Sequence, residues 1–334
     1  MVAVGSAREP AGDRAGEVSR SPVPELVGLT RAGDPRSVAR LISLVEDGSP
    51  HLPEAMAALA PFAGHARVIG LTGSPGVGKS TTTAALVAAL RTRGSRVAVL
   101  AVDPSSPFSG GALLGDRIRM QDHATDPGVF IRSMATRGHL GGLAWSTPQV
   151  LRVLDAAGFD VVLLETVGVG QSEVEVAATA DTVVVLLAPG MGDGVQAAKA
   201  GIVEIGDVFA VNKADRDGAD STVRELRNVL RMGHGPAGPG QPPGWSPPVV
   251  KTVASVGTGI AELLEALDAH ASWLAASGAL AARRQRRAGS EIRAIAMAAL
   301  WRRMDEVGAD VLAEQVSTGD VDPYAAADEL LRLL

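Results

Sequence analysis

Cysteine is absent from this 334-residue sequence, which excludes disulfide bonds and thiolate metal sites. Aromatic residues make up only 3% of the chain, so a core must be built mainly from Ala, Val and Leu. Hydrophobic residues make up 46% of the chain, which is ample for a packed core. No apolar run reaches the ~18 residues that a membrane-spanning helix needs. The six histidines are scattered without ligand spacing, so a built-in zinc or nickel site is not expected.

An excess of basic charge is also missing. The formal net charge is −6 and the isoelectric point is about 5.6, which argues against non-specific nucleic-acid binding. Residues 1–23 contain no apolar stretch typical of a secretory signal and are rich in small, polar and charged residues. We expect them to form a disordered tail, and we expect a cytoplasmic protein that binds neither nucleic acid nor membrane.

Seven short apolar segments lie between residues 65 and 277, and helical spacing of apolar residues follows each of them. Nearly continuous Val/Leu/Ile runs are typical of strands that are buried on both faces. The sequence therefore predicts an α/β fold with a doubly wound, mostly parallel sheet. The segments are "RVIGLTG", "RVAVLAVD", "VFIRSM", "DVVLLET", "TVVVLLAP", "DVFAVNKAD" and "PVVKTVAS".

Helical patterns flank this domain on both sides. Residues 24–64 carry apolar residues at three- and four-residue steps, which predicts short amphipathic helices. Residues 278–334 predict a C-terminal helical extension, and we interpret its "ARRQRRAGSEIRAIAMAALWRRM" as a solvated basic face beside an apolar dimer stripe. The Pro/Gly-rich "GHGPAGPGQPPGWSPP", which starts at Gly233, is predicted to loop out before the last strand.

The first segment with recognisable chemistry is a glycine-rich loop that matches G-x-x-x-x-G-K-[ST] between a strand and a helix. Such a loop aims backbone N–H groups at phosphate oxygens, and the helix N-terminus adds positive potential. The lysine can reach the β- and γ-phosphates, and the serine hydroxyl can bind Mg²⁺. The predicted phosphate-binding residues are Gly73, Ser74, Pro75, Gly76, Val77, Gly78, Lys79, Ser80 and Thr81.

A second segment indicates which base is bound. Asn212, Lys213 and Asp215 form N-K-x-D at the end of a predicted strand, where ligands bind in open α/β sheets. The carboxylate of Asp215 can accept hydrogen bonds from N1–H and the 2-amino group of guanine, whereas adenine offers neither donor. The pattern therefore predicts a guanine site. Backbone N–H groups of Ala254, Ser255 and Val256 are expected to complete the base pocket.

Acidic residues between these two anchors are candidates for Mg²⁺ binding and hydrolysis. Asp103 ends the second strand, and Asp116 lies on the same Gly/Ser-rich loop, although a helix cap and a surface charge are the alternatives. Glu165 stands where many GTPases place an Asp in a D-x-x-G switch. We predict that Ser80, Asp103, Asp116 and Glu165 hold Mg²⁺, and that the three carboxylates act with Lys79 in catalysis.

Other loop residues are weaker candidates. Gly168 could sense the γ-phosphate and Gln171 could orient water, while Lys199 could approach the phosphates or a partner or simply lie on a solvated helix face. No arginine finger is assigned, because Arg119 and Arg137 fit ordinary surface or salt-bridge positions better.

Together these segments closely resemble one family, the MeaB/ArgK-type P-loop GTPases, which act as chaperones of adenosylcobalamin-dependent acyl-CoA mutases. The resemblance covers about residues 25–334. It is more specific than a P-loop alone, because "DPSS…GG…LGDR" and "ETVGVGQ" occur together. The segments that carry it are "GSPGVGKST", "VDPSSPFSGGALLGDRIRM", "ETVGVGQSE", "APGMGDGVQAAKAG" and "NKAD".

The resemblance implies a SIMIBI-type G domain over residues 65–277 that binds GTP and GDP and hydrolyses GTP with Mg²⁺. It also implies a homodimer formed through the C-terminal helices, residues 278–334. The implied partner is a B12-dependent mutase, typically methylmalonyl-CoA mutase, whose cofactor loading the GTPase gates and protects. We expect slow hydrolysis by the chain alone and acceleration by a partner that orders its loops.

Three other functions remain open. A nickel-delivery GTPase of similar fold is disfavoured by the lack of cysteines and histidine clusters. A P-loop kinase of the lysine/arginine/ornithine transport type would need an acceptor pocket and should prefer ATP, whereas N-K-x-D indicates guanine. A non-catalytic dimeric scaffold that merely holds GDP is the third, and comparing GTP turnover with and without Asp103 would separate it from an enzyme.

Overall fold

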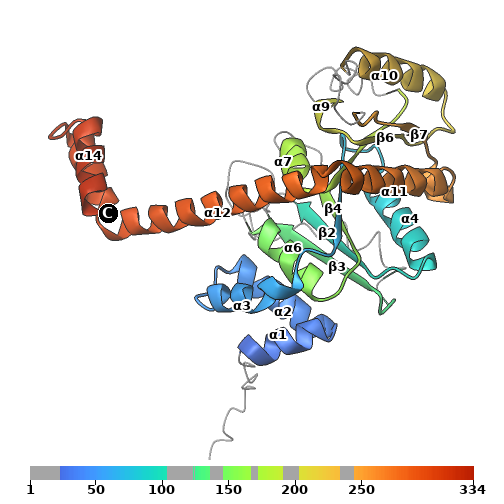
Figure 1. The fold of residues 1–334 in the computed structure, drawn as a ribbon. Helices are drawn as coiled ribbons and strands as arrows, with labels where there is room; N and C mark the ends of the chain where they lie inside the picture. The colour runs from blue at the N-terminus through green and yellow to red at the C-terminus, as the bar shows by residue number, and fades with distance from the viewer. Residues whose placement is uncertain are drawn as a thin grey trace, which may run out of the picture.

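The fold is centred on a seven-stranded sheet in the order β3-β2-β4-β1-β5-β6-β7, with all neighbouring strands parallel (Figure 1). A computed structural model describes residues 23–103, 123, 125–135, 146–166, 172–190, 203–233 and 244–334. The doubly wound α/β prediction is confirmed. The strands are β1 (Arg67–Thr72), β2 (Val97–Asp103), β3 (Val129–Ala135), β4 (Val161–Thr166), β5 (Thr182–Leu187), β6 (Val208–Val211) and β7 (Val249–Lys251).

Helices cover both faces of the sheet, which is why its strands are apolar almost throughout. Successive residues of a strand point to opposite faces. In β1, Val68 belongs to the apolar core under α6, α7 and α10, whereas Ile69 and Leu71 belong to the core under α4 and α11. The helices of this domain are α4 (Lys79–Thr92), α6 (Thr147–Ala156), α7 (Ser172–Thr179), α9 (Val203–Ile205), α10 (Ala219–Gly233) and α11 (Ile260–Ser277), with a short 3₁₀ helix η4 (Ala254–Val256).

Before the sheet, the chain forms α1 (Val23–Arg31), α2 (Pro35–Glu46), α3 (Leu52–Leu59) and the 3₁₀ helix η1 (Ala60–Phe62). Asp34 starts α2, because its side chain accepts a hydrogen bond from the Ser37 N–H at 2.8 Å and a proline follows at the first helical position. The apolar faces of these helices join the same core as α6. The predicted N-terminal helices are therefore present, and they share a core with the sheet domain.

Helix α7 packs directly on strand β1. Gly70 of β1 sits beneath it, and a Cβ at this position would collide with Val176 Cγ1. The absence of a side chain lets the helix rest on the strand backbone. This placement matters for the site because α7 begins at Ser172, a few residues after β4 ends at Thr166.

The C-terminal segment begins with α12 (Ala279–Glu306), a 28-residue helix that is roughly 42 Å long at 1.5 Å per residue. Its first half runs along the sheet domain, and its second half projects away together with α13 (Ala309–Thr318) and α14 (Pro323–Leu333) (Figure 1). In the described part of the chain, no helix is both long and apolar enough to cross a membrane.

Three arginines anchor the first half of α12 to the amino ends of the strands. Arg283 forms a two-pronged ion pair with Asp207, both distances being 2.7 Å. Arg287 donates to the Thr179 carbonyl at 2.7 Å, and Arg284 donates to the carbonyl of Ala66 at 3.0 Å. The prediction of a solvated basic face is therefore wrong for these three residues. Helical spacing shows which residues share a face but not what that face meets.

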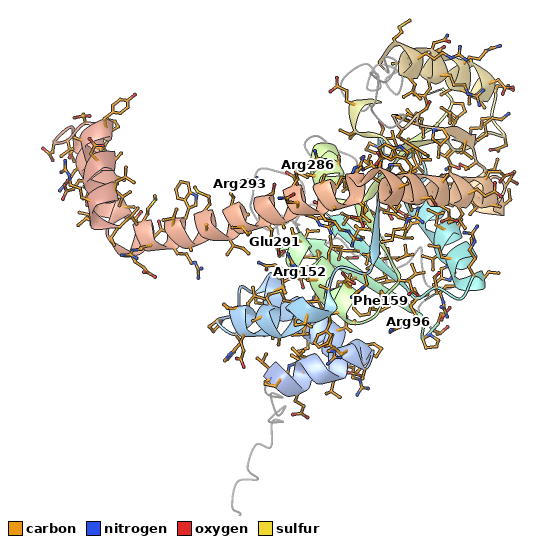
Figure 2. All side chains as sticks on the ribbon, in the orientation of Figure 1. Arg96, Arg152, Phe159, Arg286, Glu291 and Arg293 are labelled. Atoms are coloured by element: carbon orange, nitrogen blue, oxygen red, sulfur yellow. The ribbon has the colours of Figure 1, made fainter. Side chains whose placement is uncertain are left out.

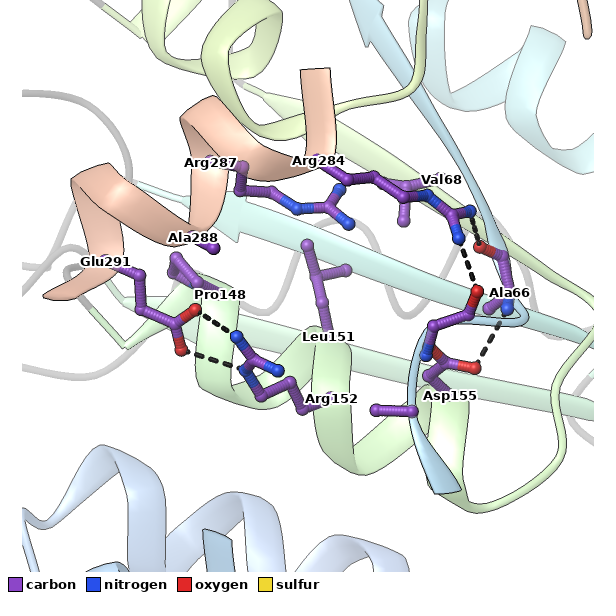
Figure 3. A pocket seen from close by; sticks show the side chains of 12 residues that line it. Ala66, Val68, Pro148, Leu151, Arg152, Asp155, Arg284, Arg287, Ala288 and Glu291 are labelled. Carbon is purple, nitrogen blue, oxygen red and sulfur yellow. Dashed lines mark hydrogen bonds and ion pairs between the residues drawn. The ribbon is translucent and has the colours of Figure 1, made fainter. Parts of the chain in front are cut away.

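A cavity of about 170 Å³ lies where α12 meets α6 and the segment before β1 (Figure 3). The charges around it are paired within the protein: Arg152 of α6 donates from Nη2 to Glu291 of α12 at 2.6 Å, and Asp155 accepts from the Ala66 N–H at 2.8 Å. Figure 2 shows Arg152 and Glu291 between the two helices, whereas Arg293, further along α12, is exposed. These contacts fix the base of the C-terminal segment.

The end of the Pro/Gly-rich stretch packs against the domain. Trp245 donates from Nε1 to the Asp207 carbonyl at 2.6 Å, and its ring centroid lies 4.8 Å from that of His270 and 5.9 Å from that of Trp273. The predicted outward loop concerns residues 234–243, which lie outside the described residues. The C-terminal end of this stretch is held by Trp245, which contacts Asp207, the residue that also binds α12.

Asp207 therefore ties three elements together. We predict that Asp207→Ala lowers the free energy of unfolding by about 3 kcal/mol, because it removes the carboxylate that pairs with the charge of Arg283. Burial raises the pKa of Asp207, but the hydrogen bonds and charges of Arg283 and His270 together outweigh burial and hold the pKa below its ordinary value. The ion pair stabilises the fold at neutral pH, and this contribution is lost as pH falls below ~3.9 and through the lowered pKa.

Urea unfolding at pH 7 and melting curves between pH 3 and 7 measure both effects. The difference between parent and variant should shrink at the acid end of this range. Asp217→Ala, at an exposed aspartate, is the matched control and should change stability by less than about 0.5 kcal/mol. Equal losses from the two substitutions would contradict the anchoring role of Asp207.

Candidate nucleotide-binding site

The glycine-rich loop joins the end of β1 to the start of α4, at the carboxyl edge of the sheet. Gly73 has φ 142° and lies so close to β5 that a Cβ would collide with the Leu186 carbonyl. Gly78 has φ 98° and is the residue from which α4 starts. Both positions require glycine, because an L side chain rarely adopts these conformations. The loop therefore wraps tightly around the N-terminus of α4, the arrangement that binds phosphate.

Lys79 is buried in this loop, with 8% of the residue exposed. Its Nζ donates to the Gly73 carbonyl at 2.8 Å and to the Ser74 carbonyl at 3.3 Å. The ammonium group thus lies against the backbone that surrounds the predicted phosphate position. A cation held there next to a helix N-terminus makes the loop a site for an anion.

Side-chain oxygens that could bind a metal ion gather beside the loop. Glu165, near the end of β4, is 3% exposed and accepts a hydrogen bond from Ser80 Oγ at 2.6 Å. Its other oxygen accepts from Thr83 Oγ1 at 3.0 Å. Glu165 lies level with Leu71 of β1 and Ala101 of β2, so the register of three strands places this carboxylate next to α4. Hydroxyl and carboxylate oxygens are the ligands that Mg²⁺ prefers, so these residues fit that ion.

The remaining predicted metal ligands and switch residues are less well placed. Asp103 is the last residue of β2, and the backbone puts it at the same sheet edge as the loop. Asp116, Gly168, Gln171 and Lys199, as well as Arg119 and Arg137, lie outside the described residues. Within the ranges that the structure does describe, no group of three or more His, Cys, Asp or Glu side chains could hold a metal ion.

Asn212 of the N-K-x-D segment connects the loop with the far side of the site. It is 3% exposed, and its Nδ2 donates to the Val77 carbonyl at 2.9 Å. Its Oδ1 accepts from the Ala254 N–H at 3.0 Å and from Thr252 Oγ1 at 3.2 Å. Three of the four hydrogen-bonding positions of this amide are thus used to join the ends of β6 and β7 to the loop.

Lys213 contacts the same loop. It is the one non-glycine residue with positive φ in the described part of the chain, at 57°, a conformation that costs about 1–3 kcal/mol. The strained backbone turns the side chain back, so that Nζ donates to the Gly76 carbonyl at 2.6 Å. The two adjacent residues Asn212 and Lys213 therefore clasp the loop at two points.

A cavity of about 170 Å³ opens between the loop and these segments. Asp215 is exposed at this cavity, as the predicted base contact requires. The residues that line it are Gly78, Thr81, Asn212, Lys213, Asp215, Arg216, Val253, Ala254 and Ser255.

The predicted backbone donors of η4 are only partly suited to a ligand. The Ala254 N–H is bound by Asn212, and the Val256 N–H donates to the Val253 carbonyl at 3.1 Å. The side chain of Val256 is 72% exposed and does not line the cavity. Of the three residues, Ser255 is therefore the candidate backbone donor to a base.

Sequence reasoning missed Thr83, Thr252 and Arg216. Thr83 follows Lys79 by four residues, so helical periodicity alone places it on the same face of α4. Thr252 and Arg216 flank recognised segments, but a polar or charged residue next to a motif carries no signal of its own.

A P-loop and an N-K-x-D segment that meet at the carboxyl edge of a parallel sheet define a P-loop NTPase. The chain belongs to the family described as methylmalonyl Co-A mutase-associated GTPase MeaB, whose family model matches residues 38–309. It is thus a GTPase-family protein, related in sequence to GTPases from archaea and bacteria.

Individual relatives span most of the chain. A Pyrococcus abyssi protein named as an inferred GTPase is 47% identical over 314 residues, which cover 93% of this chain and 96% of the relative. The GTPase ArgK of Escherichia coli is 36% identical over 278 residues, covering 80% of this chain and 82% of ArgK. A solved structure of a protein called LAO/AO transport system kinase superposes with a TM-score of 0.66 at 26% identity and covers 95% of this chain and 99% of that one.

Proposed function

We propose that this protein is a Mg²⁺-dependent GTPase that acts as a chaperone of an adenosylcobalamin-dependent acyl-CoA mutase, with methylmalonyl-CoA mutase as its partner. The observation that carries the guanine-nucleotide part is the bridge from Asn212 to Val77, which sets Asp215 and the phosphate loop on either side of one cavity. The mutase part rests on family membership, since the family is described as mutase-associated.

Asp215 gives the proposed base specificity. Its carboxylate accepts from N1–H and the 2-amino group of guanine, while the Ser255 N–H is suited to the O6 atom on the opposite edge. Adenine offers no donor at its N1 and has no 2-amino group, so it would leave a carboxylate without partners. A site built on such paired hydrogen bonds discriminates strongly between bases.

Lys79, Ser80 and Glu165 carry the proposed phosphate chemistry. Lys79 places a positive charge at the β- and γ-phosphates, and Ser80 would hold Mg²⁺, with Asp103, Asp116 and Glu165 completing its surroundings. The bound ion would neutralise charge that develops on the phosphates during transfer to water. Attack by water is oriented from the segments that follow β2 and β4. We propose slow turnover by the chain alone, because no arginine finger is assigned.

The contacts of α7 support a link between the nucleotide site and the C-terminal helices. This helix starts shortly after Glu165, and its last residue, Thr179, accepts a hydrogen bond from Arg287 of α12. A partner that senses the nucleotide through the segment after β4 would thereby also sense, or alter, the contact between α7 and α12. Such an arrangement suits a chaperone that gates loading and protection of a cofactor on another protein.

We further propose that the C-terminal helices form a homodimer. Beyond its anchored half, α12 exposes apolar side chains on several faces, and α13 and α14 continue this pattern away from the domain. A helix that is apolar on several faces needs partners around it. The exposed large apolar residues are Ile292, Ile295, Met297, Leu300, Trp301, Val311, Tyr324, Leu331 and Leu333.

A transport-type kinase is the alternative raised by the name of the structural relative. Such an enzyme would be expected to use ATP and to offer a second pocket for its acceptor beside the γ-phosphate. The Asp215 geometry favours guanine nucleotides, and the second cavity described above lies at the amino ends of the strands, away from Lys79. We favour the GTPase because of the N-K-x-D residues and the family membership.

Replacing Asp215 tests the nucleotide assignment. Asp215→Asn should weaken GDP binding by about 10²- to 10⁴-fold, because two hydrogen bonds to a charged acceptor are lost. The amide can donate to the 2-carbonyl of xanthine, so binding of xanthosine diphosphate should increase. Calorimetric titration with GDP, ADP and xanthosine diphosphate measures this, with Asp217→Asn as the matched control. Parent protein that binds ADP as tightly as GDP would rule out the assignment.

The dimer proposal predicts a change in mass. The parent should scatter light as a dimer, and Ile295→Glu combined with Trp301→Glu should give the monomer mass, because two charges cannot be buried in an apolar interface. Gln285→Glu adds a charge to an exposed position on the anchored half of the same helix and should leave the mass unchanged. A monomeric parent would disprove the proposal without affecting the nucleotide site.

The partner is tested with purified adenosylcobalamin-dependent methylmalonyl-CoA mutase. With GDP or a slowly hydrolysed GTP analogue present, the two proteins should co-elute on size exclusion, and GTP turnover should rise by about tenfold or more, within the usual range of coupling between sites. A heat-denatured sample of the mutase serves as the control. Unchanged turnover and separate elution would disprove the chaperone role without affecting the GTPase assignment.

A further inference from the structure

One hydroxyl group near the site has no role in the function proposed so far. Thr83 is fully buried in α4, one turn after Lys79. Its Oγ1 lies 3.0 Å from Glu165 Oε2 and also 3.0 Å from the Lys79 carbonyl. A hydroxyl has a single hydrogen, and a carboxylate is the stronger acceptor. Because the two distances are equal, acceptor strength decides, and we assign that hydrogen to Glu165.

The contact with the carboxylate distinguishes Thr83 from the other threonines of α4. Thr82 and Thr92 also place their hydroxyls 2.9 Å from the carbonyl four residues earlier. That local contact is thus common to several threonines of this helix and does not by itself indicate a functional role. Among the hydrogen bonds of the described residues, Thr83 is the threonine of α4 that also reaches Glu165.

Glu165 needs such a second contact because of its length. Glutamate has one more methylene than aspartate and hence one more rotatable bond, and the last torsion of the side chain has broad preferences. The two oxygens have different partners here: Oε1 accepts from Ser80 at 2.6 Å, and Oε2 accepts from Thr83. With both oxygens bound, the carboxylate cannot rotate without breaking a buried hydrogen bond.

We propose that Thr83 is a positioning residue for the metal site: its hydroxyl holds the Glu165 carboxylate so that Oε1 faces the Ser80 hydroxyl. This inference rests on the proposed function, in which Ser80 holds Mg²⁺. Partners of this kind, one shell out from the ion, orient the groups that bind it, and their loss typically costs 10- to 100-fold in metal affinity or activity.

Burial strengthens the argument, because bulk solvent does not reach these side chains to replace the hydroxyl. Thr83 and Glu165 are 0% and 3% exposed. Thr83 is also β-branched, which restricts its χ1 rotamers in a helix and keeps the hydroxyl in place. Serine could make the same hydrogen bond with less restraint, whereas valine has nearly the same shape and no hydroxyl.

These differences define the test. Thr83→Val removes the hydroxyl and Thr83→Ser keeps it, while Thr92→Val is the matched control, since it removes the same local contact from an exposed position of the same helix. Binding of Mn²⁺ to the GDP complex, followed by electron paramagnetic resonance, reports metal affinity without any turnover. GDP affinity in EDTA reports the nucleotide site without metal, and melting curves report folding.

We expect Thr83→Val to weaken Mn²⁺ binding by about tenfold or more. GDP affinity in EDTA should stay within about twofold of the parent, and GTP turnover should recover part of its loss at high Mg²⁺. Thr83→Ser and Thr92→Val should both bind Mn²⁺ like the parent. Should Thr83→Val fail to fold, Thr83→Ala relieves any crowding by the added methyl group and should show the same loss.

Unchanged Mn²⁺ binding in a folded Thr83→Val protein would overturn the inference. An equal loss in Thr83→Ser would also overturn it, because it would assign the effect to the methyl group. Failure of the proposed function looks different, because the parent itself would then bind neither GDP nor Mn²⁺ with GDP. A loss of GDP affinity in EDTA would also contradict the inference, since it would indicate a general distortion of the loop.

Discussion

The buried amide of Asn212 is the contact on which the architecture of the site depends. It connects the glycine-rich loop after β1 with the turn after β7, two segments that are far apart in the chain and separated in the sheet by β5 and β6. Because the amide is buried, each of its hydrogen bonds would be costly to leave unmade. The loop side accommodates it only because Gly78 has no side chain: a Cβ there would collide with Asn212 Nδ2. The distance between phosphate and base positions is thereby fixed by the protein itself.

Much of this could be predicted from the sequence, and the reasons are local. Near-continuous apolar runs predicted the seven strands because a parallel sheet is covered on both faces, and the loop and N-K-x-D residues were found because their spacing reflects backbone geometry. The sequence could not show how one element is rotated relative to its neighbour. "KSTTT" offers four hydroxyls, and only the rotation of α4 over β4 decides that Ser80 and Thr83 reach Glu165.

The arginines of α12 show the same difficulty on a larger scale. Their spacing is that of a solvated basic face, yet Arg283, Arg284 and Arg287 meet carboxylates and carbonyls at the amino ends of β1, β5 and β6. Their partners Asp181 and Asp207 lie 76 to 106 residues away in sequence and belong to loops without any motif. Long-range ion pairs of this type follow from the closed fold and have no local signature.

Helix α7 physically connects the two ends of the sheet. This helix has eight residues and is roughly 12 Å long, so it connects the segment after β4 with the anchor of α12 in about two turns. It rests on Gly70 without intervening side-chain atoms from that position, and its last carbonyl is bound by Arg287. Closely packed elements shift as units more readily than they deform. We therefore expect a displacement at Ser172 to reach Arg287 along the helix.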